Sequence, residues 1–266
     1  MNKKRISWIA GLLIIIGLIG SFVTFQPLEK SASFSEEKTI SSAKVSSIHL
    51  ETDNAKIEVI PFTTNEIKLE FSGNKREKKE LKFEAKVKED TLSIEVGEKQ
   101  QLRLFSFNMD SNPTLKVYLP EKHYKSLQLK TDNGRVSISD AIIDEMQVQS
   151  NNGRITLTNI QSVTTEVSSD NGEISLENVD GTLKGITSNG RVNLKTADLD
   201  RNIQLETDNG SIEIVTEKDP INTSFDVSVD NGHINILDKY TGSAVVGNGE
   251  NKIKLKTNNG RITVTK

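Results

Sequence analysis

The chain has 266 residues, of which 34% are hydrophobic, and it contains no cysteine. Apolar content this low suits thin layers of strands rather than a wide globular core. Disulfides, cysteine-ligated metals and a lipid-modified N-terminal cysteine are excluded. The formal net charge is −3, and without the three basic residues near the N-terminus the body holds 31 basic against 37 acidic residues. An acidic body argues against nucleic acid as a partner, because phosphate binding needs a basic surface.

The N-terminus combines a basic cluster with a long uncharged segment. Lys-Lys-Arg at positions 3–5 precedes WIAGLLIIIGLIGSFVTF, which spans positions 8–25 without a charge. A helix of that length rises roughly 27 Å, close to the hydrocarbon thickness of a bilayer. We predict a cytoplasmic tail over 1–6 and an uncleaved transmembrane signal anchor over 7–25, with the following chain outside the cell membrane by the positive-inside rule. A cleaved signal peptide is the alternative, although its apolar core is usually shorter.

The next segment is polar. Residues 26–45, QPLEKSASFSEEKTISSAKV, are rich in serine and charged side chains and show no sustained period. We predict a flexible stalk here. The remaining residues, 46–266, then form a single extracytoplasmic domain.

An internal repeat dominates this domain. The pattern Asx/Ser-Asn-Gly-x-Ile/Val-x-aliphatic occurs seven times, with glycine spacings of 19, 19, 18, 20, 22 and 28 residues. A degenerate eighth copy spans 53–59. The near-constant spacing of the copies indicates a repeat architecture. The predicted structural turns are Asn133-Gly134, Asn152-Gly153, Asn171-Gly172, Asn189-Gly190, Asn209-Gly210, Asn231-Gly232 and Asn259-Gly260.

Apolar residues flank each turn with strict alternation. They recur two and four positions after the glycine and seven and five positions before it, with Thr165/Val167 and Leu183/Gly185 as imperfect members, so each unit reads as two short strands with one buried face. Asn-Gly tolerates positive φ and lets the chain turn there. One interpretation is an antiparallel hairpin meander. We favour a β-solenoid with coils of about 19–20 residues, because equal coils stack equal residue types into ladders about 4.8 Å apart.

The two ends of the repeat array differ from its middle. Residues 60–125 lack the turn motif but keep alternating strands, which we expect to cap or continue the stack. The last repeat runs to the chain end at 263–266. This predicts an open edge there, blunted by Lys266 and a short strand.

The stretch Leu115-Lys116-Val117-Tyr118-Leu119-Pro120, the N-terminal anchor and the repeated Asp/Asn-Asn-Gly-Arg/Glu-Ile units resemble the bacterial "putative adhesin" β-strand-repeat family. Within it, the chain is similar to the LiaG-like proteins of Firmicutes cell-envelope stress systems. The resemblance covers about residues 46–266. It implies a right-handed parallel β-helix attached to the membrane on its outer side, and it implies no active site.

Two columns of side chains beside the turn are candidate binding features. Asp53, Asp132, Asp170, Asp208 and Asp230 share one column, with Asn151, Ser188 and Asn258 at its other positions. Stacked carboxylates could bind calcium, but Asx before Asn-Gly is expected from turn chemistry alone. The column after the glycine holds Arg135, Arg154 and Arg191, interrupted by Glu173. It is a possible ligand edge for phosphate or carboxylate, or otherwise a mixed solvated edge.

The sequence holds no signature of catalysis. His49, His123 and His233 show no metal-ligand spacing, and no nucleophile set, phosphate loop or cofactor fingerprint is present. We therefore predict a non-enzymatic protein without cofactor or small-molecule substrate, an interaction scaffold in envelope maintenance or envelope-stress response. Its expected partners are envelope-stress membrane proteins or wall polymers. A surface adhesin is the alternative, and a polysaccharide-active enzyme is a second one.

Overall fold

The structure is a computed structural model that describes residues 13–15, 17, 31–76, 80–98 and 113–266. Beyond the helical residues 13–15 and 17, its regular elements are strands, so the predicted all-β class is confirmed. The strands are β1 Ser31–Ser41, β2 Ser47–Thr52, β3 Lys56–Phe62, β4 Glu66–Arg76, β5 Leu81–Lys88, β6 Thr91–Glu98, β7 Thr114–Pro120, β8 His123–Asn133, β9 Val136–Asn152, β10 Ile155–Gln161, β11 Thr164–Asn171, β12 Ile174–Val179, β13 Thr182–Asn189, β14 Val192–Thr196, β15 Ile203–Thr216, β16 Thr223–Ile236, β17 Ala244–Val246 and β18 Asn251–Thr265.

The repeats stack in parallel, as a solenoid requires and a meander forbids. Strands that precede the Asn-Gly turns form a sheet that we call the leading sheet, in the order β5-β6-β2-β8-β9-β11-β13-β15-β18-β16-β17. Strands that follow the turns form the trailing sheet, in the order β1-β4-β7-β3-β9-β10-β12-β14-β15-β18-β16. Long strands such as β9 and β15 belong to both sheets, so β9, β10, β12, β14, β15, β13 and β11 close into a parallel ring. The right-handed sense of the coil stays a prediction.

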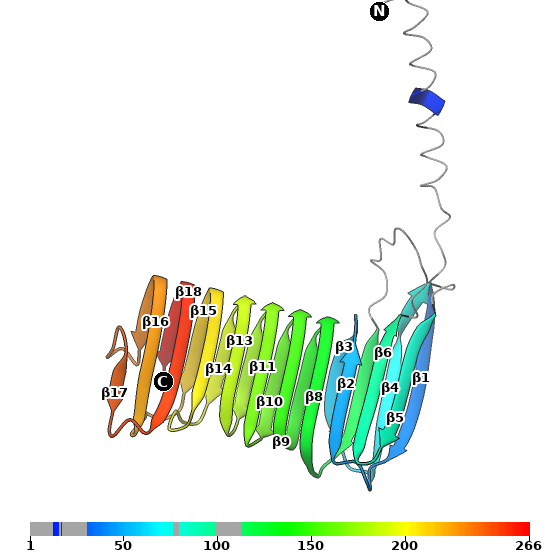
Figure 1. The fold of residues 1–266 in the computed structure, drawn as a ribbon, viewed down its shortest axis with the longest axis horizontal. Helices are drawn as coiled ribbons and strands as arrows, with labels where there is room; N and C mark the ends of the chain where they lie inside the picture. Colours follow the sequence, from blue (N-terminus) through cyan, green and yellow to red (C-terminus); the bar gives the residue numbers. More distant parts are fainter. Residues whose placement is uncertain (1–12, 16, 18–30, 77–79, 99–112) are drawn as a thin grey trace, which may run out of the picture.

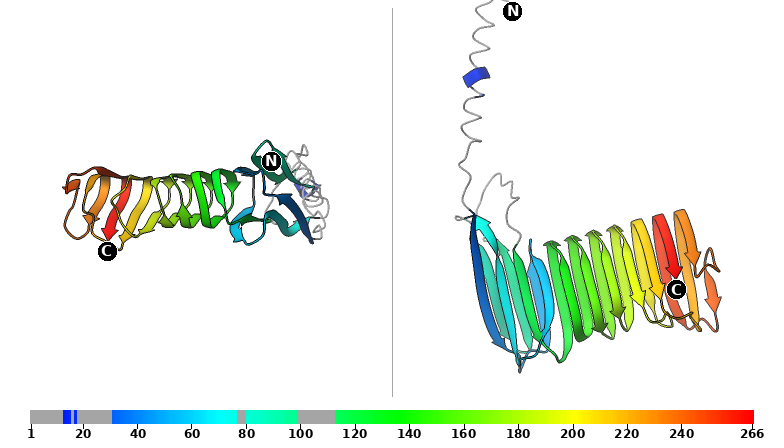
Figure 2. Two further views of the ribbon diagram at one scale, coloured as in Figure 1. Left: turned by 90° about the horizontal axis from the view of Figure 1, so that it is seen from below. Right: turned by 180° about the vertical axis from the view of Figure 1, so that it is seen from behind.

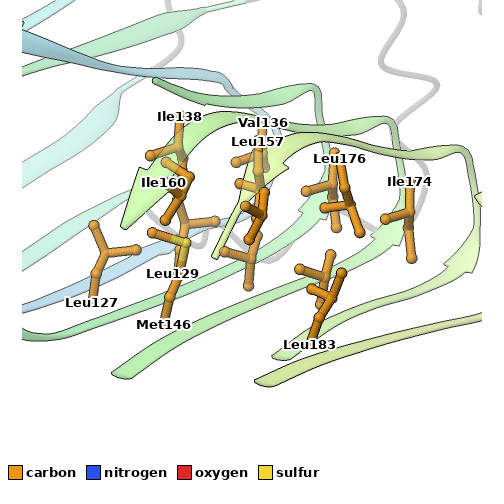
Figure 3. Packing of buried hydrophobic residues seen from close by; sticks show 14 of the residues in the cluster. Leu127, Leu129, Val136, Ile138, Met146, Leu157, Ile160, Ile174, Leu176 and Leu183 are labelled. Atoms are coloured by element: carbon orange, nitrogen blue, oxygen red, sulfur yellow. The ribbon is translucent and has the colours of Figure 1, made fainter. Parts of the chain in front are cut away.

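The core is a thin layer between the two sheets. The apolar columns recognised in the sequence point into it, and Val136, Ile138, Ile155 and Leu157 are each 0% exposed. Figure 3 shows Ile138 and Leu157 in a row with Leu176 of the next coil. Alternate residues on every strand face water, which explains how a chain of low apolar content folds.

The C-terminal strand does not end the stack. β18 lies between β15 and β16, with Ile253 paired to Ile203 on one side and to Phe225 on the other. In Figure 1 the red strand lies between the yellow and orange ones. The predicted open edge at residues 263–266 is therefore wrong. The outermost coil strand is β16, which is covered in part by β17 and by a bridge from Ile236 to Tyr240.

Charge complementarity accounts for this order. Lys254 of β18 faces outward between Gln204 and Asp226, and its Nζ lies 2.6 Å from Glu206 Oε1. Asn258 likewise separates Asp208 from Asp230. If β16 paired directly with β15 in the same register, the two aspartates would be neighbours, and like charges directly opposite are destabilising. The basic strand is thus held between two acidic ones.

The first coil is also enclosed. β2 pairs with β6 and β8, and β3 pairs with β7 and β9, so residues of the 60–125 segment lie outside the first coil. There β4 runs antiparallel to β7, and β5 antiparallel to β6. Figure 2 shows this N-terminal cap at the end of the stack opposite the C-terminal strands. The expectation that this segment caps or continues the stack is confirmed.

The predicted flexible stalk over 26–45 is wrong from residue 31 onward. β1 pairs with β4 along its whole length. Phe34 packs edge-on against Phe71 with ring centroids 5.0 Å apart, and Val45 is 1% exposed. The sequence of β1 lacks a clear apolar and polar alternation, because Lys38 lies on the same face of the strand as Phe34. There the Lys38 ammonium lies over the ring of Phe83 in a cation–π contact.

The predicted tail over 1–6 and the stalk residues 26–30 lie outside the described residues, as does most of the predicted span over 7–25. Only residues 13–15 and 17 of that span are described, and they are helical. Among the described residues, no helix has the length and apolarity needed to cross a membrane.

Candidate functional site

The predicted turn asparagines form one continuous hydrogen-bonded ladder. The side-chain Nδ2 of Asn171 donates to Asn152 Oδ1 at 2.9 Å, and Asn189 donates to Asn171 at 3.0 Å. The same bond recurs on every coil from Asn54 through Asn133, Asn152, Asn171, Asn189, Asn209 and Asn259 to Asn231. Each neutral hydrogen bond contributes about 0.5–1.5 kcal/mol, so the ladder holds the coils in register along the edge.

An aspartate in this ladder should weaken it. Asn171→Asp removes the donor to Asn152 and places a carboxylate against its oxygen, so we expect a loss of about 1–3 kcal/mol of unfolding free energy at neutral pH. The loss should shrink in acid, where the protonated side chain can donate again. Urea denaturation at pH 7 and pH 4 measures both effects. Asn248→Asp, an exposed turn residue outside the ladder, is the control, and an equal loss there would contradict the prediction.

The turn glycines are required for a reason that the sequence reasoning misjudged. We expected them to supply positive φ, but of the seven turn glycines, all within the described residues, Gly232 alone has one, at 154°. Instead the coils approach too closely for a side chain. A Cβ on Gly172 would lie 1.8 Å from the carbonyl oxygen of Gly153, and Gly153 stands in the same relation to Gly134. The turn glycines therefore form a column in which the backbone of one coil contacts the backbone of the next.

Two further ladders escaped the sequence reasoning. Thr187, Thr207 and Thr257, each buried three positions before a turn glycine, donate to a glycine carbonyl of a neighbouring coil, as Thr207 Oγ1 does to Gly190 O at 3.1 Å. A second turn on the trailing sheet places Asp140, Asn159 and Asn178 in positive φ near 53°, with Asn159 Nδ2 bonded to Asp140 Oδ1. The available signal was an Asp or Asn six residues after the glycine in three successive repeats, because Asx tolerates left-handed φ.

From Asp132 onward the aspartate column alternates with other residues, whereas Asp53 lies beside Asp132 on the neighbouring coil. Along the stack, Asp132, Asp170, Asp208 and Asp230 are separated by Asn151, Ser188 and Asn258. Asn151 Nδ2 donates to Asp132 Oδ1 at 2.9 Å, and Asn258 donates to Asp208 at 3.1 Å. Within the described residues, no three acidic or histidine side chains are grouped to hold a metal ion. The printed bonds of this column run from the side chain on one coil to the side chain on the next.

The arginines of the possible ligand edge do not form one continuous row. Arg135 and Arg154 lie on adjacent coils, but Arg154 Nη2 pairs with Glu173 Oε2 at 2.8 Å. Arg191 lies beyond Glu173 and donates from Nε to Ser211 Oγ at 3.1 Å. The structure thus brings two of the three arginines together, and Glu173 separates the third from them.

The histidines are exposed or half-buried; His49 and His123 lie on the neighbouring strands β2 and β8, and His233 lies on β16. His49 Nδ1 lies 3.0 Å from Gln128 Oε1, and His123 Nε2 lies 2.6 Å from Asp144 Oδ1. His233 contacts the carbonyl of Gly232. None of the three histidines is buried.

A groove crosses the water-facing side of the leading sheet. Its volume is about 510 Å³, and outward side chains of β8, β9, β11 and β13 line it. One row holds Ser126, Glu145, Thr164 and Thr182, and the next row holds Gln128, Gln147, Glu166 and Lys184. Sequence reasoning treated these positions as polar spacers, because only the parallel stacking aligns them.

A half-buried carboxylate lies in the loop before β15. Asp200 accepts hydrogen bonds from the backbone N–H of Asn222 at 2.7 Å and from Thr223 Oγ1 at 2.9 Å. Burial alone would raise the pKa of this carboxyl, but these bonds and that from the N–H of Ile221 outweigh it and lower the pKa. A lowered folded-state pKa stabilises above the unfolded value of about 3.9, and the gain is lost as the pH falls through the folded value.

Replacing this carboxylate should change acid stability. Asp200→Asn is expected to cost about 1–3 kcal/mol at pH 7, because the amide accepts fewer hydrogen bonds and carries no charge. The variant should also lose less further stability than the wild type between pH 5 and pH 2. Thermal melts across that range measure both effects. Asp230→Asn, on the exposed part of β16, is the control, and a steeper acid loss in Asp200→Asn would contradict the linkage.

Fold and site together define a parallel two-sheet β-solenoid whose coils are joined by side-chain and backbone ladders. The Toastrack DUF4097 family model matches residues 45–265, so the chain belongs to this family.

Solved structures with a similar outline exist at low identity. A putative cell adhesion protein from Clostridium sporogenes is 16% identical, with a TM-score of 0.43, and the match covers 88% of this chain and 99% of that one. A putative adhesin from Bacteroides fragilis is 16% identical, with a TM-score of 0.41 and coverage of 90% and 99%. No curated protein matches the chain. Similarity at this level carries no functional inference.

Proposed function

We propose that the chain is a non-enzymatic, membrane-anchored binding scaffold outside the cell membrane, LiaG-like in a role in envelope maintenance or envelope-stress response. The observation that supports it is the regular stacking of the coils. The asparagine ladder and the parallel register hold outward side chains in fixed rows over the length of the domain. Such rows suit an extended partner, and the basic cluster and apolar segment of the N-terminus suit attachment to the membrane.

The partner can be tested by co-sedimentation. The full chain in detergent is mixed with isolated cell walls and, separately, with membrane vesicles that retain their native proteins, with and without calcium. Binding to walls supports a polymer partner, and binding to native membranes alone supports a protein partner. Failure to bind either would contradict the proposal. Turnover of wall polysaccharide by the pure chain would favour the enzyme alternative instead.

A surface adhesin is the second candidate. The long rows of outward side chains suit contact with another cell as well as contact within the envelope. The two roles differ in reach, because an adhesin must extend beyond the wall. Labelling of intact cells with an impermeant reagent distinguishes them, since an adhesin is labelled without removal of the wall.

A further inference from the structure

The groove on the leading sheet has the dimensions of a binding site. Ligand pockets typically enclose about 300–1,000 Å³, and the groove holds about 510 Å³. It runs across four successive parallel strands, so each of its two rows presents one outward side chain about every 4.8 Å along the stack. A ligand that fits it is therefore extended along the stack.

The side chains that line the groove are mainly ones that form hydrogen bonds. Hydroxyl, carboxamide, carboxylate and ammonium groups line it, and none of the aromatic side chains that the structure describes does. Leu127 and Met146 lie beneath and are each 2% exposed, so they offer almost no apolar surface. This excludes ligands that need hydrophobic pockets.

Part of the lining is held in place before any ligand arrives. Gln128 Oε1 accepts a hydrogen bond from His49 Nδ1 at 3.0 Å, and Gln128 Nε2 donates to Gln147 Oε1 at 3.1 Å. Among the described residues, no acceptor pairs with Gln147 Nε2. A fixed amide donor of this kind lowers the entropic cost of binding.

Two other classes of partner fit poorly. An extended peptide that adds to a sheet needs an unpaired strand edge, but β8, β9, β11 and β13 are each paired on both sides. A polyanion would meet Glu145 and Glu166, and the lining lysine, Lys184, is already paired with Glu166. An uncharged, hydroxyl-rich polymer avoids both problems.

We propose that this groove binds a linear neutral glycan, laid along the solenoid axis across β8, β9, β11 and β13. Ser126, Thr164 and Thr182 would bond its hydroxyls, and Gln147 Nε2 would donate to one of its oxygens. This inference rests on the proposed function, because it names the polymer as the partner.

The test blocks the groove without touching the core. Thr164→Tyr and Thr182→Tyr place a ring in the groove, and tyrosine keeps a high strand propensity at these exposed positions. Thr158→Tyr, on the water-facing side of the trailing sheet, is the matched control. The full chain and each variant are titrated with chitin oligosaccharides, with cellulose oligosaccharides and with polygalacturonate as a polyanion.

We expect binding of at least one neutral glycan, little binding of polygalacturonate, and at least a tenfold loss of affinity in both groove variants but not in Thr158→Tyr. Equal affinity in all variants, or preference for the polyanion, would overturn the groove assignment. No binding of any glycan would also overturn it. The co-sedimentation result separates the two proposals, because binding to native membranes without glycan binding leaves the scaffold role intact.

Discussion

Gly172→Ala is expected to destabilise the solenoid by about 3 kcal/mol or more, at or above the upper end of typical overpacking costs. The added Cβ would lie 1.8 Å from Gly153 O and 2.8 Å from Gly153 C. Both are backbone atoms of a neighbouring coil, so no side-chain rotation can relieve the clash. Relief requires the coils to separate, and that stretches ladder hydrogen bonds on both sides.

The experiment is urea denaturation of the full chain, in which the midpoint falls while the slope is retained. Gly242→Ala is the matched control, because its Cβ would meet no atom within 4 Å and its φ is not left-handed. We expect that variant to unfold at or slightly above the wild-type midpoint. Equal midpoints for the two variants would show that the coils can move apart at little cost.

Removal of β18 is expected to abolish the fold of the C-terminal coils. A chain that ends at Glu250 lacks Ile253, Leu255, Ile262 and Val264, which are all 0% exposed. It also removes the strand that pairs with both β15 and β16. Large-to-small changes at single buried positions of this kind cost about 2–5 kcal/mol, and the truncation removes four such side chains.

Hydrogen exchange on the truncated chain should show loss of protection in β15 and β16 and retained protection in β8 to β12. A synthetic peptide of residues 251–266 added in trans should restore the protection, because the vacated position matches its charge and register. The variant Lys254→Glu of this peptide is the control and should restore less, since Glu206 and Asp226 flank that position. Full protection of β16 without any peptide would show that it can pair with β15 directly.

Local sequence patterns predicted much of the fold. The alternation around each turn predicted the strands of the repeats, such as β10 and β12, and the apolar columns that the structure buries. The recurring Asn-Gly predicted the position of the turns and the stacking of equal residues. The polar character of the 26–45 segment led to the incorrect prediction of a flexible stalk, because β1 has only Phe34 and Ile40 as large apolar residues on its inner face.

The candidate site was less accessible to sequence reasoning. Arg135 and Arg154 were placed on adjacent coils correctly, since neighbouring repeats in the middle of the array are also neighbours in space. The groove was not foreseen. Its residues are ordinary polar spacers on each strand, and they form a site only where four strands align.

The sequence by itself determined the repeat, its alternation and the residues at each turn, because these depend on contacts within about twenty residues of chain. The tertiary structure alone decided the order of the coils at both ends. Asp208 and Asp230 are consecutive members of their column along the chain, yet Asn258 lies between them in space. Strand order depends on long-range pairing and on which charged faces can be neighbours, and a local period carries no information about either. The same holds for the glycines, whose necessity comes from the closeness of the next coil and not from their own φ.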